Sequence, residues 1–409
     1  MTTALSSNLP LFDFEQDRAR QRVLAGMPRI DLARQIAAVR KIYGLGRARM
    51  AAEIARLAAG PGNITPAEYF IYRLFDPALS SEEKSRFLGK RLQYPLHIRC
   101  MDARWQAIAN DKLVFYGFMS SLGLPVPKLL GLYHPTRSAS TDTATLRSPE
   151  ELRLFLRSLS RPAFAKPVDG TYSLGCFAVE GVDASSETLC LAFGQTASLA
   201  ELARYMEQRR HGYMVQERLR PHAEMARIVG PALSTIRMLV FLSATGPRLV
   251  RALWKIPRGQ NVADNYWRGN LLGALDAETG EVLRAVSNVG VDQQQHQVHP
   301  DTGATLLGWV VPEWFEAKQL CLKAAANLPG LRTQSWDIAI AEQGPVLIEV
   351  NAGGDLNLPQ IAHGRGLLDD SLRAHLKACG SRLPALPVRI AGPWIRPFAR
   401  KLSRVVGSD

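Results

Sequence analysis

The sequence has few cysteines, and none of them forms a close pair with another. Its 409 residues include five cysteines, an odd number without the short spacings that zinc sites use. They stand at Cys100, Cys176, Cys190, Cys321 and Cys379. We therefore interpret them as reduced and mostly buried. A Gly-x-Ser-x-Gly motif is also missing, so no nucleophilic serine is indicated.

Long apolar runs are absent as well. No run approaches the ~18 apolar residues that a membrane span needs. Residues 1–25 carry three acidic side chains where a secretory signal would have an apolar block, so we expect a soluble, cytoplasmic protein. No basic run with interleaved aromatic residues indicates a specific nucleic-acid-binding module. The formal net charge of +13 predicts instead a field that concentrates anionic partners such as nucleotides or phosphorylated sugars.

The distribution of patterns along the chain predicts three regions. Residues 1–100 lack a βαβ pattern and contain two capping boxes, TPAE at 65–68 and SSEE at 80–83, so we predict a helical N-terminal unit. Strands and helices alternate irregularly over 101–380, which favours an α+β domain. Residues 381–409 form a basic tail, most simply a solvated terminal segment.

The most informative stretch is SWDIAIAEQGPVLIEVN at residues 335–351. It alternates on both sides of an EQG turn, as expected for a hairpin with a three-residue loop. This loop would pair Ala341 with Pro345 and Asp337 with Glu349. One face of the hairpin would be a core surface of Ile338, Ile340, Val346, Ile348 and Val350. The other would hold Asp337, Ala339, Ala341, Leu347, Glu349 and Asn351.

Two carboxylates and an amide would thus converge on one face of this hairpin. Directly opposed like charges are unfavourable unless a cation lies between them. Mg²⁺ prefers oxygen ligands and substrate phosphates, so we predict a magnesium site at Asp337, Glu349 and Asn351. A solvent-facing acidic pair on an ordinary hairpin is the alternative.

The spacing of Asp337, Glu349 and Asn351 resembles the metal-binding triplet of the ATP-grasp superfamily, whose magnesium ions bridge the phosphates of ATP. The resemblance covers about residues 65–375 and implies an ATP-grasp fold, in which two α+β lobes clasp the nucleotide. Further segments resemble a narrower branch, the sugar-transfer-associated or glutamate-ligase-related ATP-grasp proteins. These segments are EYFIYRLFDPALSSEEK at 68–84, QERLRPH at 216–222 and HPDTG at 299–303.

A lysine stands inside an apolar strand in AFAKPVDGTYSLG, residues 163–175. ATP-grasp proteins carry a strand lysine that contacts the nucleotide phosphates, followed by a glycine-rich loop that closes over them. The resemblance therefore implies nucleotide contacts by Lys166, Asp169, Gly170, Ser173 and Gly175. Backbone amides of such a loop can approach phosphate oxygens closely. A lysine that faces solvent on an edge strand is the alternative.

Further nucleotide contacts are implied at two other segments. Lys112, at the start of a predicted helix, resembles the family's upstream phosphate-contacting lysine; a tolerated surface lysine is the alternative. YMVQERL at 213–219 resembles the hinge between the lobes, near 214–220, where adenine binds. The contacts implied there are Glu217 and the backbone of Leu219 for adenine, with Gln216 as a further nucleotide contact. Glu224 is implied for ribose, with His222 as a rival. The alternative is a core strand that ends in a charged turn, which would have the same sequence pattern without a ligand.

One arginine lies inside the apolar strand STIRMLVF at 234–241. Arginine is costly to bury unpaired, and its fork suits phosphate or carboxylate oxygens. The resemblance implies that Arg237 contacts the transferring phosphate, whereas pairing with a structural carboxylate is the alternative. Asp264, Asn265 and Asn270 would orient an acceptor, although a well-bonded loop would need the same residue types. His222 is a further candidate substrate contact.

The resemblance implies an ATP-dependent carboxylate–amine ligase with ATP and Mg²⁺ as cofactors. A carboxylate attacks the γ-phosphate to give an acyl phosphate, and an amine then displaces phosphate to give an amide. Lys112, Lys166 and Arg237 would offset the developing negative charge. The acceptor would be a small molecule, and the positive field suits a sugar-linked, polysaccharide-linked or phosphorylated one. Replacing either hairpin carboxylate is expected to abolish activity and leave the fold intact.

Two other functions stay open from the sequence. An ATP-grasp kinase would use the same nucleotide site but phosphorylate a hydroxyl group. A non-catalytic protein would bind ATP without turnover. One departure bears on the substrate: many ATP-grasp ligases begin with a Rossmann-like domain that helps to bind the acceptor, whereas residues 1–100 have the pattern of helices.

Overall fold

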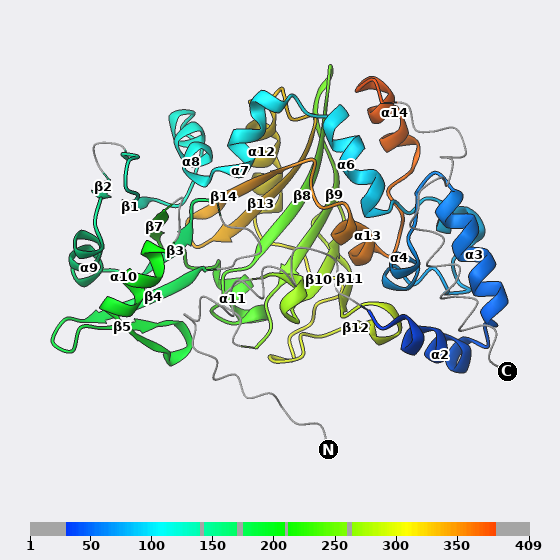
Figure 1. Ribbon diagram of the computed structural model, residues 1–409, viewed down its shortest axis with the longest axis horizontal. Helices are drawn as coiled ribbons and strands as arrows, with labels where there is room; N and C mark the ends of the chain where they lie inside the picture. Colours follow the sequence, from blue (N-terminus) through cyan, green and yellow to red (C-terminus); the bar gives the residue numbers. More distant parts are fainter. Residues whose placement is uncertain (1–29, 140–142, 170–174, 209–211, 260–263, 382–409) are drawn as a thin grey trace.

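Two sheets that lie side by side dominate the molecule, with helices packed around them (Figure 1). The structure is a computed structural model, and it describes residues 30–139, 143–169, 175–208, 212–259 and 264–381. None of the helices in these ranges is long and apolar enough to cross a membrane. Two of the predicted site residues, Gly170 and Ser173, and the predicted tail beyond residue 381 lie outside the described residues.

The first sheet is formed by the described strands between residues 129 and 217, in the order β2-β1-β7-β3-β4-β5-β6. They are β1 (Leu129–Tyr133), β2 (Ala144–Leu146), β3 (Ala163–Pro167), β4 (Phe177–Asp183), β5 (Thr188–Leu191), β6 (Thr196–Ser198) and β7 (Tyr213–Glu217). Neighbouring strands are antiparallel, except for β1 and β2. Two helices, α9 (Pro149–Arg157) and α10 (Leu199–Glu207), bury their apolar faces against this sheet.

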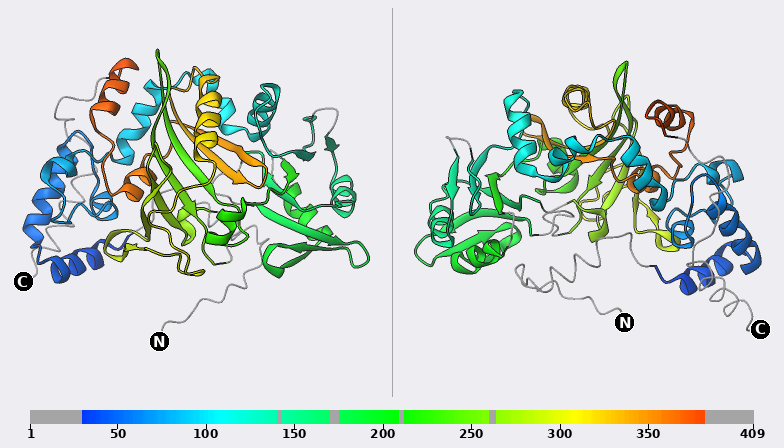
Figure 2. Two further views of the ribbon diagram at one scale, coloured as in Figure 1. Left: turned by 180° about the vertical axis from the view of Figure 1, so that it is seen from behind. Right: turned by 45° about the horizontal axis from the view of Figure 1, so that its top comes forward.

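The second sheet is antiparallel throughout its described strands, in the order β12-β11-β10-β9-β8-β13-β14. They are β8 (Thr235–Ser243), β9 (Gly246–Ile256), β10 (Leu271–Leu275), β11 (Val282–Ser287), β12 (Gln294–Gln295), β13 (Thr333–Ala341) and β14 (Gly344–Ala352). One face packs against α8 (Lys112–Ser121), α11 (Ala223–Val229) and α12 (Trp314–Ala326). Figure 2, seen from behind, shows α12 over β13 and β14.

The other face of the second sheet is covered by the N-terminal helices and by α13 (Asn357–His363). The elements here are α2 (Leu32–Tyr43), α3 (Arg47–Ala59), α4 (Pro66–Ile71), α5 (Ser81–Ser85) and α6 (Lys90–Arg99). Both predicted capping boxes are present, at Thr65 and at Ser80. The remaining helices are α7 (Gln106–Asn110) and α14 (Asp370–Ala378). The described part of residues 1–100 is therefore helical, while a domain boundary at residue 100 stays a prediction.

The hairpin of β13 and β14 confirms one predicted pair and corrects another. Asp337 pairs with Glu349 as predicted, but Ala341 pairs with Gly344 and not with Pro345. The turn is thus one residue shorter than expected, and a bulge next to Asp337 restores the register. The extra residue reverses the faces of Val346 and Leu347, since Leu347 joins the core face and Val346 the other. Ile348, which was predicted in the core, is the bulge residue and is only half-buried. The predicted face was wrong on the turn side of the bulge.

Candidate functional site

Asp337 lies in the middle of β13 and is 1% exposed. Arg237, its neighbour across the ladder in β8, donates from Nε to Oδ1 (2.8 Å) and from Nη2 to Oδ2 (2.7 Å). Lys255 in β9 donates to Oδ2 at 3.0 Å. Burial opposes ionisation, but Arg237 and Lys255 hold the pKa of the Asp337 carboxyl well below its usual range. Asp337 is therefore an ionised carboxylate shared by two buried cations.

Lys255 is a member of this cluster that was not predicted from the sequence. Its Nζ also lies 3.2 Å from Oδ1 of Asp264, which is 8% exposed. Burial lowers the pKa of Lys255, but Asp264 and Asp337 outweigh burial and raise it above its ordinary value. The signal was available, because a lysine inside the apolar run LWKIP resembles the context that singled out Lys166.

Lys166, Lys112 and Glu349 come together where the first sheet approaches β14 (Figure 1). Nζ of Lys112 lies 3.9 Å from Oε2 of Glu349. The Lys112 N–H donates to the carbonyl of Val168 (3.0 Å), which ties the start of α8 to the chain just after β3. Lys166 is 6% exposed. The structure thus brings together both lysines that the resemblance assigned to the phosphates, opposite a predicted metal ligand.

The charge of Lys166 is destabilised in this environment. Burial, and secondly the charge of Lys112, lower the pKa of Lys166 from 10.5 to about 8, although Glu349 opposes the shift. A buried ammonium group of this kind is stabilised by an added anion. Lys166 is therefore suited to a ligand that brings negative charge, such as a phosphate.

Arg237 pairs with a structural carboxylate, which was the alternative to a phosphate contact in the sequence analysis. Its guanidinium is directed at Asp337. Its side chain is 11% exposed, and both bonds to Asp337 come from one edge of the guanidinium. The charge of Asp337 outweighs burial and raises the pKa of Arg237. Contact with a transferring phosphate stays a prediction.

The predicted adenine contacts lie at the end of β7, between β1 and β3. Gln216 is buried and donates from Nε2 to a backbone carbonyl just before β1 (3.2 Å). The Glu217 N–H donates to the next carbonyl (2.8 Å), and its carboxylate lies 3.3 Å from Arg161. Leu219 is half-buried beyond the strand. These contacts match a core strand that ends in a charged turn, and binding of adenine stays a prediction.

The ends of the predicted phosphate loop are described by the structure. Asp169 lies two residues beyond the end of β3 and is exposed. Gly175 has a φ of +73°, a left-handed conformation that favours glycine. Its carbonyl accepts a hydrogen bond from the hydroxyl of Tyr213 (3.1 Å), so this end of the loop is tied to β7.

The predicted acceptor residues are engaged mostly with the protein itself. Asp264 accepts the backbone N–H (2.8 Å) and the hydroxyl of Thr235 through Oδ2. Asn270 accepts the N–H of Arg258 (2.9 Å) and donates to the carbonyl of Asn265 (2.9 Å). These bonds match the alternative of a well-bonded loop. An acceptor contact by Asp264, Asn265 or Asn270 stays a prediction.

His222 and Glu224 lie at the start of α11. Nδ1 of His222 accepts the N–H of Glu224 (3.3 Å), so the imidazole caps the helix. The His222 N–H donates to the carbonyl of Ile340 (2.9 Å) and holds this segment against β13. Glu224 is exposed. The ribose contact of Glu224 and the rival contact of His222 stay predictions.

The sequence profile of the sugar-transfer associated ATP-grasp family matches residues 96–375. This match covers more than half of the chain and includes every predicted site residue. The chain belongs to this ATP-grasp family. The predicted family and the predicted α+β fold are thereby confirmed, and the two sheets that flank Lys166 and Glu349 are those of an ATP-grasp fold. No protein with a curated description matches the sequence.

Several solved ligase structures are similar to this ATP-grasp chain. The L-amino acid ligase from Bacillus licheniformis is 13% identical (TM-score 0.36), with 66% of this chain and 48% of that chain covered. D-alanine–D-alanine ligase from Bacillus anthracis is 12% identical (TM-score 0.38; 70% and 74%). Biotin carboxylase from Campylobacter jejuni is 12% identical (TM-score 0.40; 72% and 54%). The chain spans about half the length of the first and third of these proteins.

The oxygen donors of the ATP-grasp site fit Mg²⁺ in kind. The Glu349 side chain is 32% exposed, and its contact with Lys112 at 3.9 Å is loose. Nδ2 of Asn351 is buried without a hydrogen-bond partner, as is Oγ of Ser335 directly across the ladder. Buried polar atoms nearly always have partners, so Nδ2 of Asn351 is free to donate a hydrogen bond to a bound group. Glu349 and Asn351 are accordingly suited to a metal-bound nucleotide.

Asp337 is less available to a metal ion than Glu349 and Asn351, the other two predicted ligands. Both of its oxygens already accept hydrogen bonds, from Arg237 and from Lys255. Each carboxylate oxygen keeps further acceptor capacity, so ionised Asp337 can still coordinate a cation. Its structural role, however, holds without any metal, because it neutralises two buried charges.

ATP affinity is expected to fall as pH rises above about 8, the pKa of Lys166. A phosphate beside Lys166 would raise that pKa, so binding takes up a proton wherever the free protein has lost it. The affinity would fall by at most about tenfold per pH unit. Calorimetric titration of Mg²⁺–ATP between neutral and alkaline pH would measure this. A Lys166→Arg variant, whose guanidinium does not titrate, should lose this part of the dependence; an unchanged slope would contradict the assignment.

Proposed function

We propose that this chain is an ATP-dependent carboxylate–amine ligase that forms an amide through an acyl phosphate. The observation that carries the proposal is the convergence of Lys112 and Lys166 on Glu349, where the two sheets meet. A destabilised buried ammonium group beside a second lysine suits the phosphates of a nucleotide. Membership of an ATP-grasp family supports ATP as that nucleotide.

The charges of the site support Mg²⁺ as the partner of ATP. Four cations, Lys112, Lys166, Arg237 and Lys255, interact with the carboxylates of Asp264, Asp337, Glu349 and Asp355. Because these charges nearly balance, a polyphosphate requires additional positive charge. Mg²⁺ would supply that charge and offset the negative charge of the phosphates when it is bound. Glu349 and Asn351 would hold it, together with Asp337.

The chain's own residues would act by positioning and by neutralising charge. Lys112 and Lys166 would bind the phosphates and stabilise the negative charge that spreads over the γ-phosphate during transfer. Arg237 would share this task through the part of its guanidinium that does not bond Asp337. No side chain needs to form a covalent bond with the substrate, because the substrate carboxylate is itself the nucleophile.

The substrates would be a small carboxylic acid and an amine in the cytoplasm, where ATP is plentiful. The family description, sugar-transfer associated, favours a sugar-linked partner. The net charge of +13 favours one that is phosphorylated or otherwise anionic.

Incubation with ATP, Mg²⁺ and panels of acids and amines tests this proposal. Release of ADP is expected to require both an acid and an amine, and mass spectrometry should find their condensation product. An acid labelled with heavy oxygen in its carboxylate should pass one labelled oxygen to the released phosphate, because the acyl phosphate breaks at its carbonyl carbon. A phosphorylated hydroxyl compound without amide would indicate a kinase, and ATP binding without turnover a non-catalytic protein; either result would overturn the proposal.

A further inference from the structure

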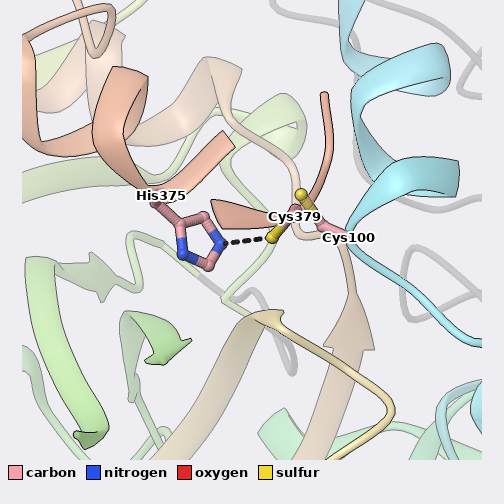
Figure 3. A group of neighbouring side chains, drawn as sticks. All are labelled: Cys100, His375 and Cys379. Carbon is pink, nitrogen blue, oxygen red and sulfur yellow. Dashed lines mark hydrogen bonds between the residues drawn. The ribbon is translucent and has the colours of Figure 1, made fainter. Parts of the chain in front are cut away.

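Three metal-ligating side chains meet near the start of β13 and the end of β8 in the second sheet. They are the thiols of Cys100 and Cys379 and the imidazole of His375 (Figure 3). One ligand atom from each lies within 4.8 Å of both others, and Sγ of Cys379 is 3.7 Å from Nε2 of His375. This is the single such group of His, Cys, Asp and Glu side chains among the residues that the structure describes.

The backbone explains why these side chains converge. His375 and Cys379 are four residues apart at the end of α14, so both lie on the same face of the helix. Cys100 is the C-cap of α6, and its carbonyl accepts the N–H of Arg332 (2.8 Å), the residue before β13. Two helices and the start of a central strand therefore fix the positions of the three donors.

His375 is held in place by its neighbours. Its ring is stacked on Phe241 of β8, with 4.2 Å between centroids and 7° between planes. The hydroxyl of Thr333 lies 3.0 Å from Nε2. His375 is 7% exposed and Cys100 2%, while Cys379 is half-buried and gives the group access to solvent. Such preorganised donors lose little freedom when they bind a ligand.

We propose that Cys100, His375 and Cys379 form a binding site for a thiophilic divalent cation, with Zn²⁺ as the ion that fits best. Two sulfur donors and one nitrogen donor suit Zn²⁺, whereas Mg²⁺ prefers oxygen. A fourth ligand would be water, because three protein ligands leave one tetrahedral position open. The ion would replace the Thr333 contact if it binds Nε2.

Binding would exchange protons for the metal ion. Each thiol must be deprotonated to become a ligand, so the formation of two Zn–S bonds would release every proton that the two thiols still carry. Affinity is therefore expected to fall as the pH is lowered. No oxidant or reductant is consumed, and the site would not depend on the ligase proposal, since none of its three side chains is a predicted nucleotide or acceptor contact.

The bound ion would act as a clamp on the second sheet. It would join the end of α6 to the end of α14, and α14 already packs on β8 through His375. Thr333, which contacts His375, begins the strand that carries Asp337. A ligand that binds only the folded state stabilises it by mass action, so Zn²⁺ should raise the melting temperature.

Titration of the reduced full-length protein with Co²⁺, followed by competition with Zn²⁺, tests the site. One Co²⁺ per chain is expected to give visible bands of a tetrahedral ion and a near-ultraviolet thiolate-to-cobalt band, both removed by Zn²⁺. Cys100→Ser and Cys379→Ser should each weaken metal binding by about 100-fold or more. Loss of a ligand should cost at least as much affinity as loss of a group that only hydrogen-bonds to a ligand. Cys190→Ser, at an exposed cysteine of β5, is the matched control and should bind as the wild type does.

His375→Gln gives a further variant in case a serine substitution disturbs folding, which circular dichroism would reveal. It should keep both thiolates but lose the tetrahedral spectrum. The proposal is overturned if the wild type shows no thiolate-to-cobalt band. It is equally overturned if the band keeps its wild-type intensity and affinity in both Cys100→Ser and Cys379→Ser, because the ion would then bind elsewhere.

Discussion

Asp337→Asn is expected to lower the free energy of unfolding by about 3 to 5 kcal/mol, because it leaves Arg237 and Lys255 as buried cations without their shared carboxylate. The Asp337 side chain is 2% exposed, so water has little access to the uncompensated charges. Urea denaturation followed by circular dichroism would measure the loss. The sequence alone led us to expect an intact fold in this variant, and the contacts of Asp337 reverse that expectation.

Glu349→Gln is the matched control for Asp337→Asn on the neighbouring strand. Its partner Lys112 is 3.9 Å away and the Glu349 side chain is 32% exposed, so the fold should be nearly as stable as that of the wild type. Magnesium-dependent turnover of ATP should nevertheless be lost, if Glu349 holds the metal. Full activity in a stable Glu349→Gln variant would remove this carboxylate from the mechanism. Equal urea midpoints for Asp337→Asn and the wild type would contradict its structural role.

Local patterns were sufficient to predict the parts of this protein that depend on near neighbours. The capping boxes at Thr65 and Ser80 are formed within one helical turn, so four residues specify each of them. The Asp337–Glu349 pair follows from the alternation of side chains along a hairpin. Lys166 could be singled out because it stands inside an apolar strand; it is buried and does not face solvent, and its contact with phosphate stays a prediction.

Features that depend on distant partners were missed. A bulge next to Asp337 changed the faces of Val346 and Leu347, because packing against the core outweighed the turn length that the letters EQG favour. The carboxylates that pair with Lys255 come from two other segments of the chain. Sequence spacing therefore could not show that this strand lysine has partners.

The cysteines illustrate the same limit. Their separation along the chain excluded a site with short spacings, yet Cys100 and Cys379 meet through the packing of α6 and α14. The expectation that the cysteines are mostly buried was also wrong in part, because Cys190 is exposed while Cys176 and Cys379 are half-buried. Ligands that converge from distant elements become visible only in the fold.

Lys166→Met is expected to stabilise the fold and to slow ATP turnover strongly. Below pH 8 the ammonium group is charged in both the folded and the unfolded chain, and its burial costs about 3 kcal/mol, from a pKa of about 8 against 10.5. Methionine of similar length removes this cost. The same substitution deletes a charge that would bind the phosphates, so turnover should fall by about 100- to 1000-fold. Urea denaturation at neutral pH and an ADP-release assay would measure the two effects.

Lys255→Met should change stability in the opposite direction, although both lysines are strand residues with similar burial, 6% and 8% exposed. Its removal leaves Asp264 and Asp337 without their shared cation. The gain from Lys166→Met should also shrink between pH 8 and 10.5, because there the unfolded wild-type chain binds more protons than the folded one and its stability rises with pH. Equal destabilisation of both variants at every pH would show that the buried charge of Lys166 does not lower the stability of the folded protein. The physical argument for assigning Lys166 to a bound anion would then fail.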